Sequence, residues 1–276
     1  MYKVVKMLNN NGVLAYDMDN RREVIFLGHG IGFGKRPGEI FKGIPEAKLY
    51  TLTNRRQELP LIKVVNGINP IYLEATGKLL ELAEKRFGHI HNDILLPLAD
   101  HIALAAKRMQ EGRELPNPFT ADIRILFPEE FQTAAEGASL LRQMTGVAVS
   151  EDEIGYITLH IHSALSDEDV AQSLDLARLT RKCIRIIEEG MGSQLKESSL
   201  GYSRLMSHIR YMLARIRSKE KIPLDVEDYV KEQFPKAYAL ADQVCRQMEA
   251  ELRLPAPIEE NGFLGLHIQR VWNGEG

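Results

Sequence analysis

The chain has 276 residues, of which 44% are hydrophobic and 26% are charged. This composition predicts one to three globular domains with well-formed cores. The chain opens without a charged-then-apolar leader, and no apolar run approaches the length of about 18 residues that a membrane-spanning helix requires. We therefore expect no membrane insertion and a cytoplasmic location. The two cysteines, Cys183 and Cys245, provide neither a disulfide framework nor a metal-binding spacing.

The formal net charge of −3 is unevenly distributed along the chain. Residues 1–57 carry ten Lys/Arg and five Asp/Glu, a net charge of +5, which leaves −8 for the rest of the chain. A small basic head on an acidic body indicates an anionic partner for the head, with nucleic acid as the first candidate. A basic surface without a specific partner is the alternative.

The head, residues 1–57, is predicted to be a small all-β domain with a four-stranded antiparallel sheet. Residues 9–12, Asn-Asn-Asn-Gly, are strong turn formers, and residues 17–20 form a second turn. No helical period of useful length interrupts the β-rich segments. The expected strands are residues 2–8, 13–16, 23–27 and 47–52.

A glycine-rich loop, residues 28–36, separates the third and fourth predicted strands. Alternating glycines allow the backbone to approach a ligand closely. A dinucleotide or phosphate loop would need a strand that leads directly into a helix, and Pro37-Gly38 excludes that. Phe33 is suited to stack on a base, while Lys35 and Arg36 are suited to meet phosphates. A flexible connecting loop is the alternative interpretation.

From about residue 60 onward, the sequence consists of two copies of one module. The sequence separation between His101 and His160 is the same as that between His208 and His267. Other residues recur at the offset that takes His101 to His208, and they include Arg108 with Arg215, Glu153 with Glu260 and Phe127-Pro128 with Phe234-Pro235. A period of domain length indicates duplication of a folded unit, because solenoid repeats are shorter.

Each module is predicted to be a helical bundle. Apolar residues recur at helical spacing over residues 75–87, 93–109 and 131–144, and Ser150 to Glu153 is a capping box that begins a helix carrying His160. The second module repeats these elements as far as Trp272. Connectors are expected at residues 54–60 and 165–169. The predicted domains are residues 1–57, 62–168 and 169–276.

Three interpretations of the paired histidines compete. A metal site requires three or four converging ligands, and His160 and His162 point to different faces of a helix, so they do not chelate one ion. Histidines that only pack are the commonest case. Their recurrence in both modules favours a third interpretation, in which a neutral imidazole accepts a phosphoryl group and the module gains a charge of about −1.5 to −2.

The motifs of the head and the duplicated histidines together resemble the BglG/SacY family of bacterial transcriptional antiterminators. The resemblance is carried by the Lys-x-Leu-Asn-Asn-Asn run at residues 6–11, the Gly-x-Gly-Ile-Gly-Phe loop at residues 28–33, and the two histidine modules. It is strongest to the glucose-type (GlcT-like) branch. In that family the head is a co-antiterminator RNA-binding domain that dimerises, and the modules are phosphotransferase-system (PTS) regulation domains.

The resemblance implies which residues of the head contact RNA, namely Lys6, Asn11, Gly28, His29 and Phe33. Single-stranded loops and bulges are the parts of RNA that proteins read by sequence. His29 stands where the family usually carries Arg or Lys, and Gly12 adds one residue to the first hairpin. An imidazole lacks the permanent charge and the fork geometry of arginine.

The resemblance also implies that His101, His160, His208 and His267 are phosphorylation sites. In the family, a sugar-specific PTS permease component phosphorylates the first module and switches the protein off, whereas the phosphocarrier HPr phosphorylates the second module and promotes activity. The expected function is antitermination by a homodimer at a hairpin in an mRNA leader, with no enzyme activity and no cofactor. The rival interpretations are a DNA-binding activator with the same modules and a hydrolase with a histidine-ligated metal.

Overall fold

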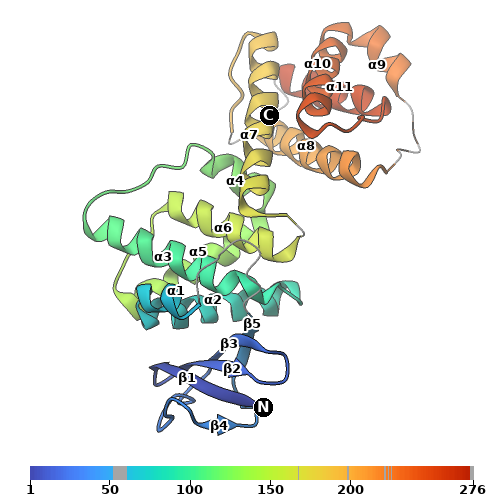
Figure 1. Ribbon diagram of the computed structural model, residues 1–276. Helices are drawn as coiled ribbons and strands as arrows, with labels where there is room; N and C mark the ends of the chain where they lie inside the picture. Colours follow the sequence, from blue (N-terminus) through green and yellow to red (C-terminus); the bar gives the residue numbers. More distant parts are fainter. Residues whose placement is uncertain are drawn as a thin grey trace. The chain divides into compact units, whose positions relative to one another are not determined.

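The computed structural model describes residues 1–51, 61–166, 168–197, 199–220, 222, 224 and 226–273. The chain forms two compact units, of which unit 1 comprises Met1–Thr120 and Glu129–Ser173, and unit 2 comprises Ala121–Pro128 and Leu174–Gly276. Strands occupy the N-terminal part and helices the rest (Figure 1), which confirms the predicted fold class. The predicted connector at residues 54–60 falls within 52–60, outside the described residues. Among the helices described, none has the length and apolar character needed to cross a bilayer.

The N-terminal strands form one antiparallel sheet in the order β4-β1-β2-β3-β5. The four predicted strands are present, each shifted by at most a few residues at its ends. A fifth strand, β4, pairs with the start of β1 and was not predicted, because it is too short to show an alternating pattern. The strands are β1 (Tyr2–Asn9), β2 (Gly12–Asp17), β3 (Arg22–Leu27), β4 (Ile40–Phe41) and β5 (Lys48–Thr51).

The asparagine run forms the turn of the first hairpin, as predicted. Asn9 pairs with Gly12 across the turn, and the backbone N–H of Asn11 donates to Oδ1 of Asn9 at 2.8 Å. Such side-chain acceptors stabilise a turn by replacing a backbone partner. The backbone N–H of Gly28 donates to the carbonyl of Asn11 at 2.9 Å, so the hairpin turn and the start of the glycine-rich loop are joined.

The sheet buries both of its faces, because alternate residues of β2 and β3 point in opposite directions. One face packs against the segment that contains the glycine loop and β4, through Val4, Val13, Ala15, Val24, Phe26, Ile31 and Phe41. The other face joins the core of the helices that follow, through Leu14, Ile25, Leu27 and Tyr50. The head and the first module therefore share one hydrophobic core.

Unit 1 also contains the helices of the first module, which pack around this shared core. Helix α2 begins at Pro70, ahead of the predicted start at Ala75, because Oδ1 of Asn69 accepts a hydrogen bond from Ile71 N and proline favours the first helical position. The helices are α1 (Leu61–Gly67), α2 (Pro70–Phe87), the 3₁₀ turn η1 (Asn92–Ile94), α3 (Leu95–Gln110), α5 (Pro128–Thr145) and α6 (Glu151–Leu165).

Two local features fix α2 and α6 in place. A side-chain carbon at Gly77 of α2 would lie 2.6 Å from Cδ1 of Leu27, so glycine lets the Leu27 side chain pack directly against the helix. Oγ of Ser150 accepts a hydrogen bond from Glu153 N at 3.4 Å, which confirms the predicted cap of α6. The cap gives α6 a well-defined start and places His160 in its third turn.

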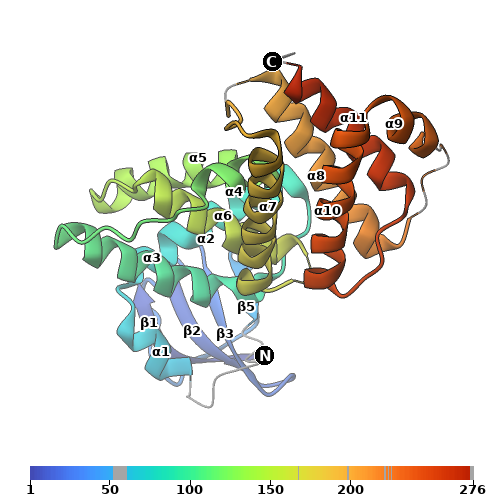
Figure 2. The ribbon, with the colours of Figure 1, turned by 90° about the horizontal axis from the view of Figure 1, so that it is seen from above.

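Unit 2 contains the second module together with most of a short helix from the first. The second-module helices are α7 (Val170–Met191), which begins in unit 1, α8 (Leu200–Ser218), α9 (Glu227–Gln233), α10 (Pro235–Leu252) and α11 (Glu259–Trp272). Helices α8, α10 and α11 lie side by side in both views (Figures 1 and 2). Helix α4 (Thr120–Leu126) has its counterpart in α9, and α5 in α10, with both ends of each helix displaced by the offset of the sequence repeat.

Helix α4 is held within unit 2 by a buried ion pair. Asp122 is buried, and Nε of Arg181 in α7 donates to its Oδ2 at 2.9 Å. Burial raises the pKa of the Asp122 carboxyl, and the guanidinium opposes that increase. An isolated buried carboxylate is costly, so the arginine is needed wherever this aspartate is ionised.

Candidate functional site

The structure brings the histidines of each module together in pairs. His101 on α3 and His160 on α6 have ring centroids 5.1 Å apart. His208 on α8 and His267 on α11 have ring centroids 4.6 Å apart and nearly parallel rings. Because the sequence separation is the same in both pairs, the duplicated spacing corresponds to a duplicated contact between two helices.

A buried carboxylate and an arginine accompany the first pair. Oε2 of Glu153 lies 3.0 Å from Nε2 of His101, and Nη2 of Arg108 donates to Oε1 of the same carboxylate at 2.6 Å. Glu153 is 1% exposed. Burial alone raises the pKa of its carboxyl, but the hydrogen bonds from His101 and Arg108 outweigh burial and the pKa is lowered. Glu153 is therefore ionised at neutral pH.

The second pair has the same partners in a different arrangement. Arg215 donates to both oxygens of Glu260, from Nε to Oε1 at 2.7 Å and from Nη2 to Oε2 at 3.1 Å. Nε2 of His208 lies 3.4 Å from Oε2, a long contact in which that nitrogen lacks a well-formed hydrogen bond. The carboxylate is thus shared by histidine and arginine in the first module and held mainly by arginine in the second.

The second histidine of each pair stays neutral. Burial, followed by the charge that His101 carries when it is protonated, lowers the pKa of His160 to about 3. Burial, followed by the charges of His208, Arg270 and Arg204, lowers the pKa of His267 to about 4. Nδ1 of His160 is buried and has no hydrogen-bond partner. Both side chains carry an unprotonated ring nitrogen at neutral pH.

The surroundings of the two pairs differ in charge. Arg204 precedes His208 by one turn of α8, and Arg270 follows His267 by one turn of α11, and both arginines are exposed. The residues at the equivalent positions of the first module are Pro97 and Ser163. Two cations therefore adjoin the second pair where the first module has none.

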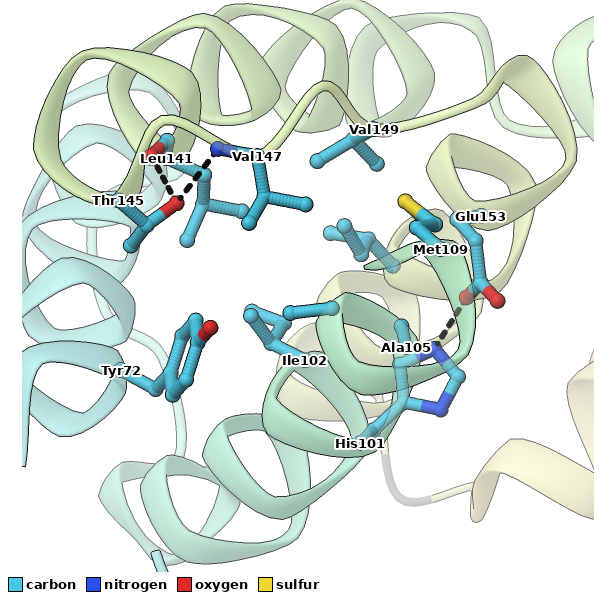
Figure 3. A pocket seen from close by; sticks show the side chains of 12 residues that line it. Tyr72, His101, Ile102, Ala105, Met109, Leu141, Thr145, Val147, Val149 and Glu153 are labelled. Atoms are coloured by element: carbon cyan, nitrogen blue, oxygen red, sulfur yellow. Dashed lines mark hydrogen bonds and ion pairs between the residues drawn. The ribbon is translucent and has the colours of Figure 1, made fainter. Parts of the chain in front are cut away.

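A small apolar pocket lies beside His101. Figure 3 shows His101 and Glu153 at one end of it, joined by their hydrogen bond, and Tyr72 and Thr145 toward the other. The remaining lining is aliphatic or sulfur-containing and includes Ile102, Met109, Leu141, Val147, Val149 and Ile157. His101 thus borders the apolar interior of the module as well as its surface.

His162 does not join the paired histidines. Its Nδ1 lies 3.0 Å from Oε1 of Glu130, at the start of α5. Over the part of the chain that the structure describes, no group of three or more His, Cys, Asp or Glu side chains is placed to hold a metal ion. The glutamates that contact His101 and His208 were not predicted as site residues. Their recurrence at the offset of the repeat was the signal that could have identified them.

The head residues predicted to contact RNA fall into two groups. Phe33 is 79% exposed at the tip of the glycine loop, and His29 is exposed beside it. Gly28 is needed for packing within the head, because a side-chain carbon there would lie 3.0 Å from Cα of Ala47. The loop is therefore shaped by its glycines so that the aromatic ring points outward.

Lys6 and Asn11 instead contact the first module. Nζ of Lys6 donates to Oδ1 of Asn66 at 2.5 Å, and Nδ2 of Asn11 donates to Oε1 of Glu74 in α2 at 3.0 Å. Asn9 donates to the other oxygen of Glu74 at 3.3 Å. Oδ1 of Asn11 also accepts a hydrogen bond from the backbone N–H of Gly30 at 2.8 Å. Asn11 therefore links the hairpin, the glycine loop and α2.

Comparison with known proteins identifies both parts of the chain. Residues 2–58 match the CAT RNA binding domain, and residues 77–164 and 181–271 each match the PRD domain. The PtsGHI operon antiterminator of Bacillus subtilis (strain 168) is 30% identical over 275 residues, which cover 99% of this chain and 98% of that protein.

Other relatives extend the same similarity. Protein GlcT of Staphylococcus haemolyticus (strain JCSC1435) is 30% identical over 277 residues, covering 99% of this chain and 96% of that protein. The beta-glucoside operon antiterminator of Dickeya chrysanthemi is 27% identical over 273 residues, covering 98% and 96%. The crystal structure of GlcT CAT-PRDI superposes with a TM-score of 0.52 at 33% identity, covering 60% of this chain and 98% of that one.

Proposed function

Because the chain belongs to the BglG/SacY family of transcriptional antiterminators, with a CAT RNA-binding head and two PRD domains, we propose that its four paired histidines are phosphoryl acceptors through which the sugar phosphotransferase system controls the head. The head, residues 1–57, binds a hairpin in an mRNA leader as a homodimer and prevents a terminator from forming. The modules, residues 62–168 and 169–276, are phosphorylated by the sugar phosphotransferase system. The chain is a cytoplasmic phosphoacceptor and not itself an enzyme.

The observation that carries this proposal is the contact between histidine rings in both modules. Each pair contains one ring nitrogen that burial keeps free of protons, and a neutral imidazole is a competent nucleophile toward an activated phosphoryl group. Both pairs are half-buried at a junction of two helices. A phosphoryl group of about −1.5 to −2 charge placed there changes how the helices and any second copy of the chain associate.

The exposed ring of Phe33 supports the RNA-binding role of the head. An aromatic side chain at the tip of a loop offers a face on which an unpaired base stacks, and the nearby Arg36 supplies positive charge, whereas Lys35 pairs with Glu39. Lys6, Asn11, Gly28 and His29 complete the proposed RNA contact set.

The charge around each pair supports opposite effects for the two modules. In the second module Arg204 and Arg270 are placed to neutralise a phosphoryl group, which favours activation by the phosphocarrier HPr. In the first module no arginine occupies the equivalent positions, so phosphorylation by a sugar-specific permease component adds uncompensated charge and switches the protein off.

Antitermination in cells tests this proposal. Replacing His101 and His160 by alanine removes the acceptors of the first module, so we expect read-through of a terminator reporter even without the inducing sugar. The matched control is the alanine double variant of His89 and His91, a second pair of neighbouring histidines in unit 1 with ring centroids 6.0 Å apart. Repression that persists in the first variant, or is equally lost in the control, contradicts phosphoryl control through the paired histidines.

A further inference from the structure

We infer that Glu153 is a positioning residue that fixes the tautomer of His101, so that Nδ1 of His101 is the atom that accepts the phosphoryl group. The inference rests on the proposed function, because it specifies the atom at which the proposed phosphorylation occurs. It assigns a role to Glu153 and Arg108, which do not touch the phosphoryl group, and it predicts a weaker version of the same device at Glu260.

The first step concerns the hydrogen between His101 and Glu153. The carboxylate of Glu153 is ionised and can only accept hydrogen bonds. Its Oε2 lies 3.0 Å from Nε2 of His101, so the hydrogen belongs to Nε2. A neutral imidazole with Nε2–H carries its lone pair on Nδ1. The other carboxylate oxygen is occupied by Arg108 at 2.6 Å, which keeps the carboxylate in this orientation.

The second step concerns the surroundings of His101. The imidazole is 20% exposed, so a donor group can reach it, and the facing ring of His160 is neutral and adds no positive charge. Tyr156 contributes a further ring contact at 5.8 Å. His101 is therefore held by a carboxylate on one nitrogen and by ring contacts with His160 and Tyr156, which leaves Nδ1 as the reactive nitrogen.

The third step is the transfer itself. The lone pair of Nδ1 forms a bond to phosphorus while the bond between phosphorus and the donor's leaving atom breaks, and the electron pair of that bond leaves with the donor. The Nε2–H bond stays intact, so the phosphorylated imidazole becomes cationic. Glu153 lies against that N–H and stabilises the positive charge as it develops.

The variant Glu153→Gln tests whether Nδ1 of His101 is the acceptor, because Arg108 sets the orientation of the new amide group. The guanidinium can only donate, so it takes the amide oxygen, and the amide NH₂ group then faces Nε2 of His101. That nitrogen must now accept, and the hydrogen moves to Nδ1. Glu153→Gln therefore reverses the tautomer and blocks Nδ1 while the side-chain volume is kept.

The experiment uses the full chain labelled with ¹⁵N-histidine and long-range ¹H–¹⁵N correlation spectra at pH 7. The His101 signals are identified by their absence in His101→Gln. We expect the Nε2–H tautomer in the unchanged chain and the Nδ1–H tautomer in Glu153→Gln. Glu130→Gln is the matched control, because it removes the carboxylate beside His162 and should leave His101 unaltered. An Nδ1–H tautomer in the unchanged chain overturns the inference.

Phosphorylation with potassium phosphoramidate, a small donor with a P–N bond, gives the second readout. We expect phosphate on Nδ1 of His101 in the unchanged chain, and a loss of roughly ten- to hundredfold in rate in Glu153→Gln, the range found when an outer carboxylate is removed from a ligating histidine. Phosphate on Nε2 of His101 overturns this inference but leaves the proposed function standing. Absence of phosphate from all four paired histidines overturns the proposed function as well.

The second module supplies an internal comparison. Arg215 holds both oxygens of Glu260, and Nε2 of His208 is 3.4 Å away, so the carboxylate constrains this histidine less. We expect Glu260→Gln to slow phosphorylation of His208 less than Glu153→Gln slows that of His101. If Glu153→Gln fails to fold, as judged by its far-ultraviolet circular dichroism, the spectrum and the phosphorylated nitrogen of the unchanged chain still decide the inference.

Discussion

At the scale of single residues, burial keeps the second histidine of each pair, His160 and His267, neutral. His160 has one ring nitrogen shielded from solvent without a partner, and its pKa falls to about 3. An unfolded chain would bind a proton on the same side chain near pH 6.5. Below that pH the unfolded state binds more protons than the folded state, so folding is progressively disfavoured until the pH reaches the folded pKa.

This linkage predicts the behaviour of His160→Gln. Between about pH 6.5 and pH 4 we expect the variant to lose stability less steeply than the unchanged chain, by up to about 1.4 kcal/mol per pH unit. Urea unfolding followed by circular dichroism at several pH values measures the slope. His89→Gln, which alters a histidine outside the repeated pairs, should keep the original slope, and equal slopes in all three proteins would contradict the prediction.

The contacts of the residues that surround the pairs could not be predicted from the sequence. Glu153 and Arg108 recur at the offset of the repeat, so the sequence shows that both are duplicated. Their function depends on distances of 3.0 Å and 2.6 Å between side chains that lie far apart in the sequence. Spacing along one helix predicts neighbours within that helix only, and the carboxylate and the imidazole come from two different helices.

At the scale of elements, α8 and α11 carry positive charges near the histidines at positions where α3 and α6 carry none. Arg204 and Arg270 replace Pro97 and Ser163 at positions one helical turn from the histidines. Helix geometry places such residues on the same face as the histidine. The duplicated modules therefore keep the paired histidines and differ in the charges beside them.

We expect the double variant Arg204→Gln with Arg270→Gln to weaken the response of the second module to phosphorylation. Two exposed charged contacts contribute about 1 kcal/mol together, and their loss lowers the melting temperature of the phosphorylated form by about 4 °C in a module of this size. Differential scanning calorimetry before and after phosphorylation measures this shift. Replacing Arg210 and Arg246 by glutamine removes the same charge elsewhere in unit 2, and an equal shift there would contradict the prediction.

The elements that were predicted well are those with long, regular patterns. The strands of the first hairpin and helices α3, α5 and α6 were predicted to within a few residues, because alternation or helical periodicity extends over each of them. The short elements α1, α4, α9 and β4 were not predicted. Each of these helices makes only about two turns, which is too short to establish a period.

At the scale of the whole molecule, the head and the first module meet at the proposed RNA contacts. Lys6 donates to Asn66, and Asn9 and Asn11 donate to Glu74, between segments that are distant in the sequence. While these contacts last, the hydrogens that Lys6 and Asn11 donate in them are not available to RNA. No periodic pattern in the sequence indicates such a contact, because it joins polar residues from two different domains.

This competition predicts opposite effects for two variants. Glu74→Ala frees the amides of the first hairpin, so we expect roughly three- to tenfold tighter binding of an RNA hairpin selected against the full chain. Phe33→Ala removes a stacking platform and should weaken binding about ten- to hundredfold. Fluorescence anisotropy measures both affinities.

Two variants serve as controls for these affinities. Glu81→Ala removes the same charge two turns further along α2, and Met18→Ala removes an exposed apolar side chain at the opposite end of the head sheet. An increase in affinity with Glu81→Ala as large as that with Glu74→Ala would show that the tighter binding comes from the lost negative charge. It would not then come from release of the first hairpin. An unchanged affinity in Phe33→Ala would contradict the assignment of the glycine loop.

The short distance between the rings of each pair also limits how many phosphorylation states the molecule can adopt. Two phosphoryl groups carrying nearly two charges each, on rings with centroids 5.1 Å or 4.6 Å apart, repel by several kcal/mol even at an effective dielectric constant of about 20. Under the proposed phosphorylation, a second group on the same pair is strongly disfavoured. Each pair then has three states, unmodified or modified on one of its two rings, and the two pairs together allow nine combinations rather than sixteen.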